Sequence, residues 1–310
     1  MEAVSKRYEE KIDALFKMVP SFQKVGKKGY HPGIETMEAF DHFLWHPHRD
    51  FRIIHVAGTN GKGSVSSMLA SVLMGMGHRV GLYTSPHLVD FRERIRVNGQ
   101  MISQQFVIDF VEQHRSFFEP LHPSFFELTT AMALHYFALQ KIDVAVIEVG
   151  LGGRLDCTNI ISPDLSVITN ISFDHTGLLG DTLSKIASEK AGIIKPHTPV
   201  IIGEYPEDTL PVFVSEAEAK QAHIVLAQDT PLYIDKESHA DYDIYSSTPY
   251  GDLRAELRGY CQEKNVNTLL HAIDKLQYIG YNISEEAIRK GFAQVCQLTG
   301  LMGRWQQLYD

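Results

Sequence analysis

The residues from 58 to 64 have the composition of a loop that binds phosphate groups. They lie between an apolar run, 51–57, and a stretch whose apolar residues recur at helical spacing from Val65 to Met76. Glycines let a backbone approach phosphates closely, the first N–H groups of a helix are unpaired, and a lysine adds a mobile cation. The spacing departs from G-x-x-x-x-G-K-[ST], because position 56 is valine and a glycine follows the lysine. We predict a variant phosphate loop; the alternative is a turn that only packs helix on strand. The loop residues are Gly58, Thr59, Asn60, Gly61, Lys62, Gly63 and Ser64.

Acidic residues follow two predicted strands, at the sheet edge where parallel α/β folds bind ligands. Glu148 closes the apolar run 143–149, and Asp174 with His175 follows the run 165–170. Mg²⁺ prefers oxygen ligands and shares them with nucleotide phosphates, so Glu148 is a candidate metal ligand. His175 is a candidate metal or phosphate contact. The alternatives are a glutamate that only caps a turn and a packed or solvated histidine.

Ser85 and Lys190 carry weaker local signals. Ser85 follows the predicted strand 79–83, and a simple Ser-Pro turn explains it equally well. Lys190 lies near the end of a predicted helix, where most lysines are merely solvated. The glycines at 150–153 could be mistaken for a dinucleotide fingerprint, but the final glycine is missing and no predicted helix begins there.

The elements that must position these residues alternate between strand and helix. From residue 51 onward this alternation predicts an α/β fold with a doubly wound, mainly parallel sheet flanked by helices. A hairpin around Asn98-Gly99 predicts a small antiparallel excursion from the sheet, and residues 228–257 indicate irregular or antiparallel β structure. The predicted strands are 51–57, 79–83, 143–149, 165–170, 199–203 and 223–227, and the predicted helices are 104–118, 128–139, 182–191, 208–220, 265–278 and 284–296.

Composition narrows the class of protein. The 310 residues allow one large domain or two ordinary ones, and 29 basic against 38 acidic residues give a net charge of −9. That balance argues against binding to nucleic acid or to an anionic membrane. Three widely spaced cysteines form neither a disulfide framework nor a zinc site, and no run of about 18 apolar residues occurs. We expect a cytoplasmic protein, and a monomer.

Together these segments resemble the Mur ligase superfamily of ATP-dependent amide ligases, and within it the folylpolyglutamate synthase and dihydrofolate synthase family. The resemblance covers roughly residues 30 to 205. A weaker match, 259–267, places Asn265 at a nucleotide-contacting position, although the usual His-Gln there reads Cys-Gln. The matching stretches are GTNGKGS (58–64), TSPHL (84–88), RERIRVNG (92–99), IEVGLGGRLDCTN (147–159), ITNISFDHTGLLGDT (168–182) and SEKAGIIK (188–195).

The resemblance implies a catalytic set of Lys62, His175 and Lys190. Lys62 and the loop amides would hold the phosphates of ATP, while Ser85, Glu148 and His175 would hold Mg²⁺. Lys190 matches a position that this family carries as a carbamate, formed from the lysine and CO₂.

The resemblance also implies a substrate site. Phe126, Thr129 and Asp156 match the region that contacts the pterin or folate, and Arg304 matches a junction arginine that reaches ATP. Family members continue into a second α/β domain after this junction. We therefore expect residues 1–300 to form the ATP-binding domain and 301–310 to lead to a C-terminal domain that this chain lacks. The chain alone would then bind ATP with little or no ligation.

The implied reaction is ATP-driven amide formation. A substrate carboxylate takes the γ-phosphoryl group, and the amine of L-glutamate displaces phosphate from the resulting acyl phosphate. Dihydropteroate or folate is the expected acceptor. One alternative is a ligase that acts on a cell-wall precursor, and another is a nucleotide-binding module without catalysis. A GTPase switch is disfavoured because no N-K-x-D motif occurs.

Overall fold

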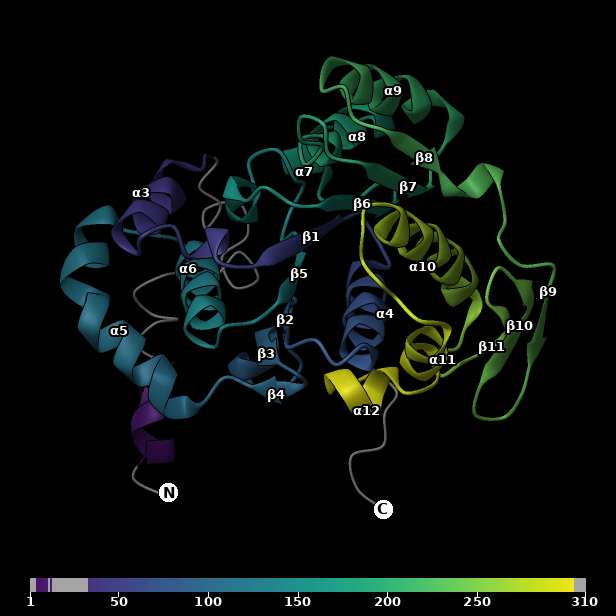
Figure 1. The fold of residues 1–310 in the computed structure, drawn as a ribbon. Coiled ribbons are helices and arrows are strands. Elements are labelled where there is room, and N and C mark those ends of the chain that lie inside the picture. Colours follow the sequence, from purple (N-terminus) through teal and green to yellow (C-terminus); the bar gives the residue numbers. More distant parts are fainter. Residues whose placement is uncertain (1–3, 11, 13–32, 304–310) are drawn as a thin grey trace.

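The protein is built on a central eight-stranded sheet, seen in a computed structural model that describes residues 4–10, 12 and 33–303 (Figure 1). The strand order is β4-β3-β2-β5-β1-β6-β7-β8. The six strands β2, β5, β1, β6, β7 and β8 run parallel, and β3 and β4 pair antiparallel at one edge. The predicted α/β class with a mainly parallel sheet is confirmed. The strands are β1 (Arg52–Ala57), β2 (Val80–Tyr83), β3 (Ile95–Val97), β4 (Gln100–Met101), β5 (Val144–Glu148), β6 (Leu165–Asn170), β7 (Val200–Glu204) and β8 (Ile224–Leu226).

Helices cover the sheet on both faces (Figure 1). Side chains of β1 alternate between them: Ile54 and Val56 join a core with the helices on one face, and Ile53 joins a core with those on the other. The first group is α4 (Lys62–Gly75), α10 (Tyr260–Tyr278), α11 (Glu285–Ala293) and α12 (Val295–Thr299). The second is α3 (Glu35–Phe43), α5 (Gln104–Phe118) and α6 (Phe125–Leu139). Beside β6 and β7 lie α7 (Thr176–Leu179), α8 (Leu183–Ala191) and α9 (Leu210–Ala219).

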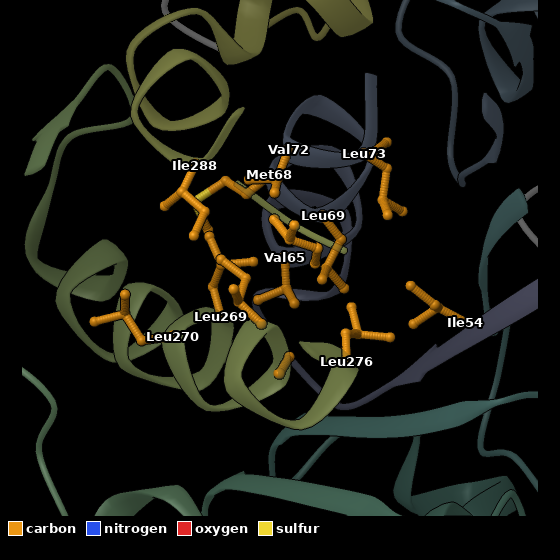
Figure 2. Close-up of a cluster of buried hydrophobic side chains, with 14 of the residues drawn as sticks. Ile54, Val65, Met68, Leu69, Val72, Leu73, Leu269, Leu270, Leu276 and Ile288 are labelled. Atoms are coloured by element: carbon orange, nitrogen blue, oxygen red, sulfur yellow. The ribbon is translucent and has the colours of Figure 1, made fainter. Parts of the chain in front are cut away.

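The helix that follows the phosphate loop, α4, is held by an apolar core on its buried face. Leu69 of α4 lies among side chains of α10 and α11, including Leu269 and Ile288 (Figure 2). Two glycines let α4 and α11 approach closely. A Cβ at Gly75 would lie 2.8 Å from the Ala287 carbonyl oxygen, and one at Gly291 would lie 2.6 Å from the Cα of Val72. This packing fixes the start of α4 relative to the sheet.

Both predicted antiparallel segments are present, and one differs in its placement. The hairpin at Asn98-Gly99 does not leave the sheet: β3 pairs with the edge strand β2, so the hairpin extends the sheet itself. The second segment forms a separate three-stranded sheet of β9 (Asp235–Ser238), β10 (Asp243–Thr248) and β11 (Gly251–Ala255). Tyr245 and Leu253 of that sheet pack into the core beneath α10 and α11.

Three predicted helix boundaries were wrong. α6 begins at Phe125 because Ser124 and Glu127 form a capping box ahead of the apolar face. α10 begins at Tyr260, which places Asn265 inside the helix rather than at its start. The predicted helix 284–296 is interrupted at Gln294, whose φ of −136° and ψ of 35° separate α11 from α12. In the described residues, no helix is both long enough and apolar enough to span a bilayer.

Candidate active site

The phosphate loop connects β1 to α4 and requires glycine at two positions. Gly58 has a φ of 146°, and a Cβ there would lie 1.9 Å from the Thr169 hydroxyl oxygen. Gly61, the residue before α4, has a φ of 84°, and a Cβ there would lie 2.2 Å from Asn265 Oδ1. Both conformations favour a residue without a side chain.

The end of the neighbouring strand β6 fixes the shape of this loop. The Thr59 N–H donates to the Asn170 carbonyl oxygen and the Asn60 N–H to Asn170 Oδ1, each at 2.9 Å. The Thr169 hydroxyl donates to the Asn60 carbonyl oxygen at 2.5 Å. The sequence analysis did not single out Thr169 and Asn170. Two polar residues at the carboxyl end of an apolar strand were the available signal.

Two lysines converge on one carbonyl oxygen of the loop. Lys62 Nζ and Lys190 Nζ each donate to the Gly58 carbonyl oxygen at 3.0 Å, and Lys62 also reaches the Thr59 carbonyl oxygen at 3.2 Å. Lys190 is only 2% exposed. Burial, and next the positive charge of Lys62, lower the pKa of Lys190 to about 7. Lys190 is thus an amine with a substantial neutral fraction near neutral pH, not a solvated helix-end lysine.

These lysines line a pocket at the carboxyl edge of the sheet. Its walls come from the loop after β1, the loop after β5 and the segment after β6, so three crossovers meet at one place. Asp174 and His175 also line the pocket, and the Asp174 carboxylate is 3.5 Å from His175 Nε2. The lining residues are Gly58, Lys62, Val149, Gly150, Leu151, Gly152, Asp174, His175 and Lys190.

Glu148 lies beside the phosphate loop and is held by the Ser85 turn. The Ser85 N–H donates to Glu148 Oε2 at 3.0 Å, and a Cβ at Gly63 would lie 3.7 Å from the same oxygen. The side chain is 3% exposed. Burial raises the pKa of Glu148 to about 7, although Lys62, the Ser85 amide and Arg94 act in the opposite direction. The carboxyl group is therefore poised between its two protonation states at neutral pH.

Two of the three predicted substrate residues, Phe126 and Asp156, contact the loop that lines the pocket. The ring of Phe126 covers Gly150, where a Cβ would come within 2.2 Å of it. Asp156 is buried and accepts from the Leu151 N–H at 2.8 Å and from the Thr158 hydroxyl at 2.5 Å. These hydrogen bonds hold the loop after β5 in place. The buried Thr129 hydroxyl donates to the Phe125 carbonyl oxygen of its own helix at 2.7 Å. Their contact with a substrate stays a prediction.

The start of α10 reaches the phosphate loop from the other side. Gln262 Nε2 donates to the Ser64 hydroxyl at 3.1 Å, and Asn265 Nδ2 donates to Gln262 Oε1 at 2.9 Å. The structure thus brings Asn265 to the loop, as predicted for a nucleotide contact. Arg304 lies outside the described residues.

The comparisons with known proteins agree with this geometry. The profile of the Mur ligase middle domain matches residues 56–227. The chain belongs to the Mur ligase family. It is 38% identical over 280 residues to "Dihydrofolate synthase/folylpolyglutamate synthase" of Bacillus subtilis, covering 86% of this chain and 65% of the relative. It is 37% identical over 263 residues to the protein of that name in Haemophilus influenzae, covering 83% and 55%. The chain therefore spans between 55% and 65% of the length of these two relatives.

The solved structures point in the same direction. The chain superposes on "FPGS-AMPPCP-folate complex" with a TM-score of 0.83 and 32% identity, covering 93% of this chain and 72% of that one. The predicted resemblance to the folylpolyglutamate and dihydrofolate synthases is confirmed.

For a member of this family, the donors present suit a magnesium ion shared with nucleotide phosphates. Ser85 and Glu148 offer oxygen atoms beside the loop, and His175 lines the adjoining pocket. Within residues 4–10, 12 and 33–303, no three His, Cys, Asp or Glu side chains are grouped so as to hold a metal alone. Mg²⁺ commonly uses one or two carboxylates and completes its octahedron with water and phosphate oxygens, so this donor set fits it.

Proposed function

We propose that this chain carries the phosphoryl-transfer site of a ligase that joins L-glutamate to dihydropteroate or to a folate. The observation that supports it most is the convergence of Lys62 and Lys190 on the Gly58 carbonyl oxygen, in a pocket beside the buried carboxyl group of Glu148. The relatives named above carry these activities in their names. One solved relative is titled as a complex with folate and AMPPCP, an analogue of ATP.

In the proposed first step, an oxygen of the acceptor carboxylate attacks the γ-phosphorus of ATP. The bond to the bridging oxygen breaks, and ADP and an acyl phosphate form. Lys62 moves from the loop carbonyls to the phosphates and offsets their negative charge, while the backbone N–H groups at the start of α4 donate hydrogen bonds to the phosphate oxygens. Mg²⁺, held by Ser85, Glu148 and His175 when bound, adds further positive charge.

In the second step, the amine of L-glutamate attacks the acyl carbon. Phosphate leaves, and the attacking amine loses one proton to solvent as the amide forms. Holding the reactants in line contributes about 7–11 kcal/mol to lowering such a barrier, so positioning by the pocket walls is the main task of the protein.

Lys190 is proposed to act as a carbamate. Its neutral amine adds to CO₂ and releases a proton, which converts a buried neutral amine into a buried anion next to Lys62. The lowered pKa of Lys190 supports this step, because only the neutral amine reacts with CO₂. The anion would then pair with Lys62 and help to fix the metal. Residues 1–300 are proposed to form the ATP-binding domain that carries this site.

Trapping of the acyl phosphate tests the proposal. The chain is incubated with ATP, Mg²⁺, bicarbonate and dihydropteroate, and hydroxylamine converts any acyl phosphate into a stable hydroxamate. We expect hydroxamate and ADP in equal amounts, and neither with Lys62→Ala. Lys185→Ala, which removes an exposed lysine paired with Asp181, is the matched control. ADP release that does not respond to dihydropteroate or folate would leave only a nucleotide-binding module, and a response to a cell-wall precursor instead would identify a different ligase.

A further inference from the structure

Arg94 is a buried cation with no hydrogen-bonded carboxylate among the described residues, although Glu148 and Glu93 attract it from farther away. It closes the 3-10 helix Phe91–Arg94 ahead of β3 and is 4% exposed. Its neighbours have oxygen partners: Arg92 pairs with Asp90 at 2.6 Å, and Arg96 Nε donates to the Glu93 carbonyl oxygen at 3.2 Å. In the part of the chain that the structure describes, the Arg94 side chain donates one hydrogen bond, from Nε to His87 Nδ1 at 2.8 Å.

The backbone places this guanidinium group beside the candidate active site. The Thr84 N–H donates to the Arg94 carbonyl oxygen at 3.0 Å, and the next residue, Ser85, donates to Glu148. The central carbon of the guanidinium lies 5.3 Å from the centre of the Phe125 ring. Phe126, the following residue, covers the pocket loop at Gly150. Arg94 thus lies between the Ser85 turn and the start of α6, where Tyr83 and Phe126 have ring centres 5.8 Å apart.

The remaining donors of Arg94 are its two terminal NH₂ groups. Burying an ion without an opposite charge costs several kcal/mol, so such groups are normally paired. The nearby Glu93 illustrates the usual arrangement, since its carboxylate accepts from the N–H groups of Leu88, Val89 and Asp90. A guanidinium fork matches the two oxygens of a carboxylate or of a phosphate. An anionic ligand would supply the hydrogen-bonded partner that Glu148 and Glu93, which act on Arg94 only at longer range, do not.

We propose that Arg94 binds the acceptor carboxylate and stays hydrogen-bonded to its oxygens while the acyl phosphate forms. This inference rests on the proposed function, which supplies an acceptor carboxylate beside Glu148. The aromatic rings of Phe125 and Phe126 flank the position and suit the flat benzoyl group that carries the carboxylate of a pteroate. Arg94 would then select an acidic acceptor over a neutral one of the same shape.

The test compares an acid with its neutral counterpart. Calorimetry measures the binding of pteroate and of pteroate carboxamide to the 310-residue chain with Mg²⁺ and AMPPCP present. We expect the parent to prefer the acid by roughly tenfold to a hundredfold, the range of a hydrogen bond to a charged group. Arg94→Gln should abolish the preference, Arg94→Lys should restore part of it, and the affinity for AMPPCP should not change. Arg96→Gln, which removes a buried arginine bound to backbone oxygens, should keep the preference.

Each other outcome overturns the inference. Equal binding of acid and amide by the parent, binding of neither, or a retained preference in Arg94→Gln would show that no carboxylate meets Arg94. A purely structural role would appear in unfolding by urea without ligand, where Arg94→Met would lose as much stability as Arg96→Met. We expect Arg94→Met to be at least as stable as the parent, because it removes a buried charge that has no hydrogen-bonded anion. Failure of the proposed function is seen separately, as the absence of hydroxamate from the parent chain.

Discussion

Replacing Lys190 with methionine should stabilise the folded protein near neutral pH. The pKa of this amine falls from 10.5 to about 7 on folding, chiefly because the side chain is 2% exposed. Each pKa unit corresponds to about 1.4 kcal/mol, so charged Lys190 costs on the order of 4–5 kcal/mol below pH 7. Methionine has a similar length and carries no charge. The Gly58 carbonyl oxygen would keep its hydrogen bond from Lys62, so the substitution leaves no buried acceptor unpaired.

The sign of the pH dependence follows from proton binding. Between pH 7 and 10.5 the unfolded chain holds more protons at this position than the folded chain, so the stability of the parent rises with pH across that window. The advantage of Lys190→Met is therefore full below pH 7 and shrinks as pH rises toward 10.5. We take about 1.4 kcal/mol per pKa unit and subtract about 1 kcal/mol for the lost hydrogen bond. The free energy of unfolding of Lys190→Met should then exceed that of the parent by about 3 kcal/mol at pH 6.5, and by clearly less at pH 9.

Urea unfolding at several pH values, in buffers free of CO₂ so that no carbamate forms, measures this gain. Lys185→Met is the matched control, because Lys185 is exposed and its change should stay within about 0.5 kcal/mol at every pH. A Lys190→Met variant less stable than the parent at pH 6.5 would refute the reasoning. A difference in free energy of unfolding between Lys190→Met and the parent that does not narrow with rising pH would also refute it.

Three further predictions concern the phosphate loop and its carboxyl group. Gly58→Ala should cost about 1–3 kcal/mol in urea unfolding and abolish nucleotide binding, because the new Cβ would meet the Thr169 hydroxyl oxygen at 1.9 Å; an unchanged affinity would contradict this. Lys62→Ala should weaken calorimetric binding of ATP with Mg²⁺ by about tenfold or more without loss of fold, whereas Lys185→Ala should not. The pKa of Glu148 is raised to about 7, so the benefit of Mg²⁺ to nucleotide binding should grow from pH 6 to pH 8 in the parent and stay flat in Glu148→Gln. A parent profile as flat as that of the variant would argue against Glu148 as the ligand.

Much of the fold followed from local sequence. Apolar runs of strand length, separated by helical periods, predicted all six parallel strands, and the bounds of each were placed to within a residue or two. The hairpin was recognised from Asn98-Gly99, but its attachment to β2 was not, because strand pairing depends on which edge is free. The break at Gln294 was missed because no glycine or proline marks it. It is visible only in the backbone angles.

The candidate site divides in the same way. The residues after the strands β1, β5 and β6 were identified from the sequence, because in a parallel sheet the carboxyl ends of strands meet at one edge whatever the details of packing. The support from Thr169 and Asn170 was not identified, since hydroxyl and amide contacts between neighbouring strands have no periodic signature.

The sequence by itself determined the α/β class, the phosphate loop and the family, because these depend on residue types at short, fixed spacings. Only the tertiary structure decided the state of the charged groups. Lys190 looks like a solvated helix-end lysine in the sequence, and burial makes it a largely neutral amine. Arg94 is one arginine among several in a basic stretch, and the fold buries it with a single side-chain hydrogen bond, to His87. Charge states and unmet partners depend on which atoms surround a group after the chain has folded, and local spacing does not carry that information.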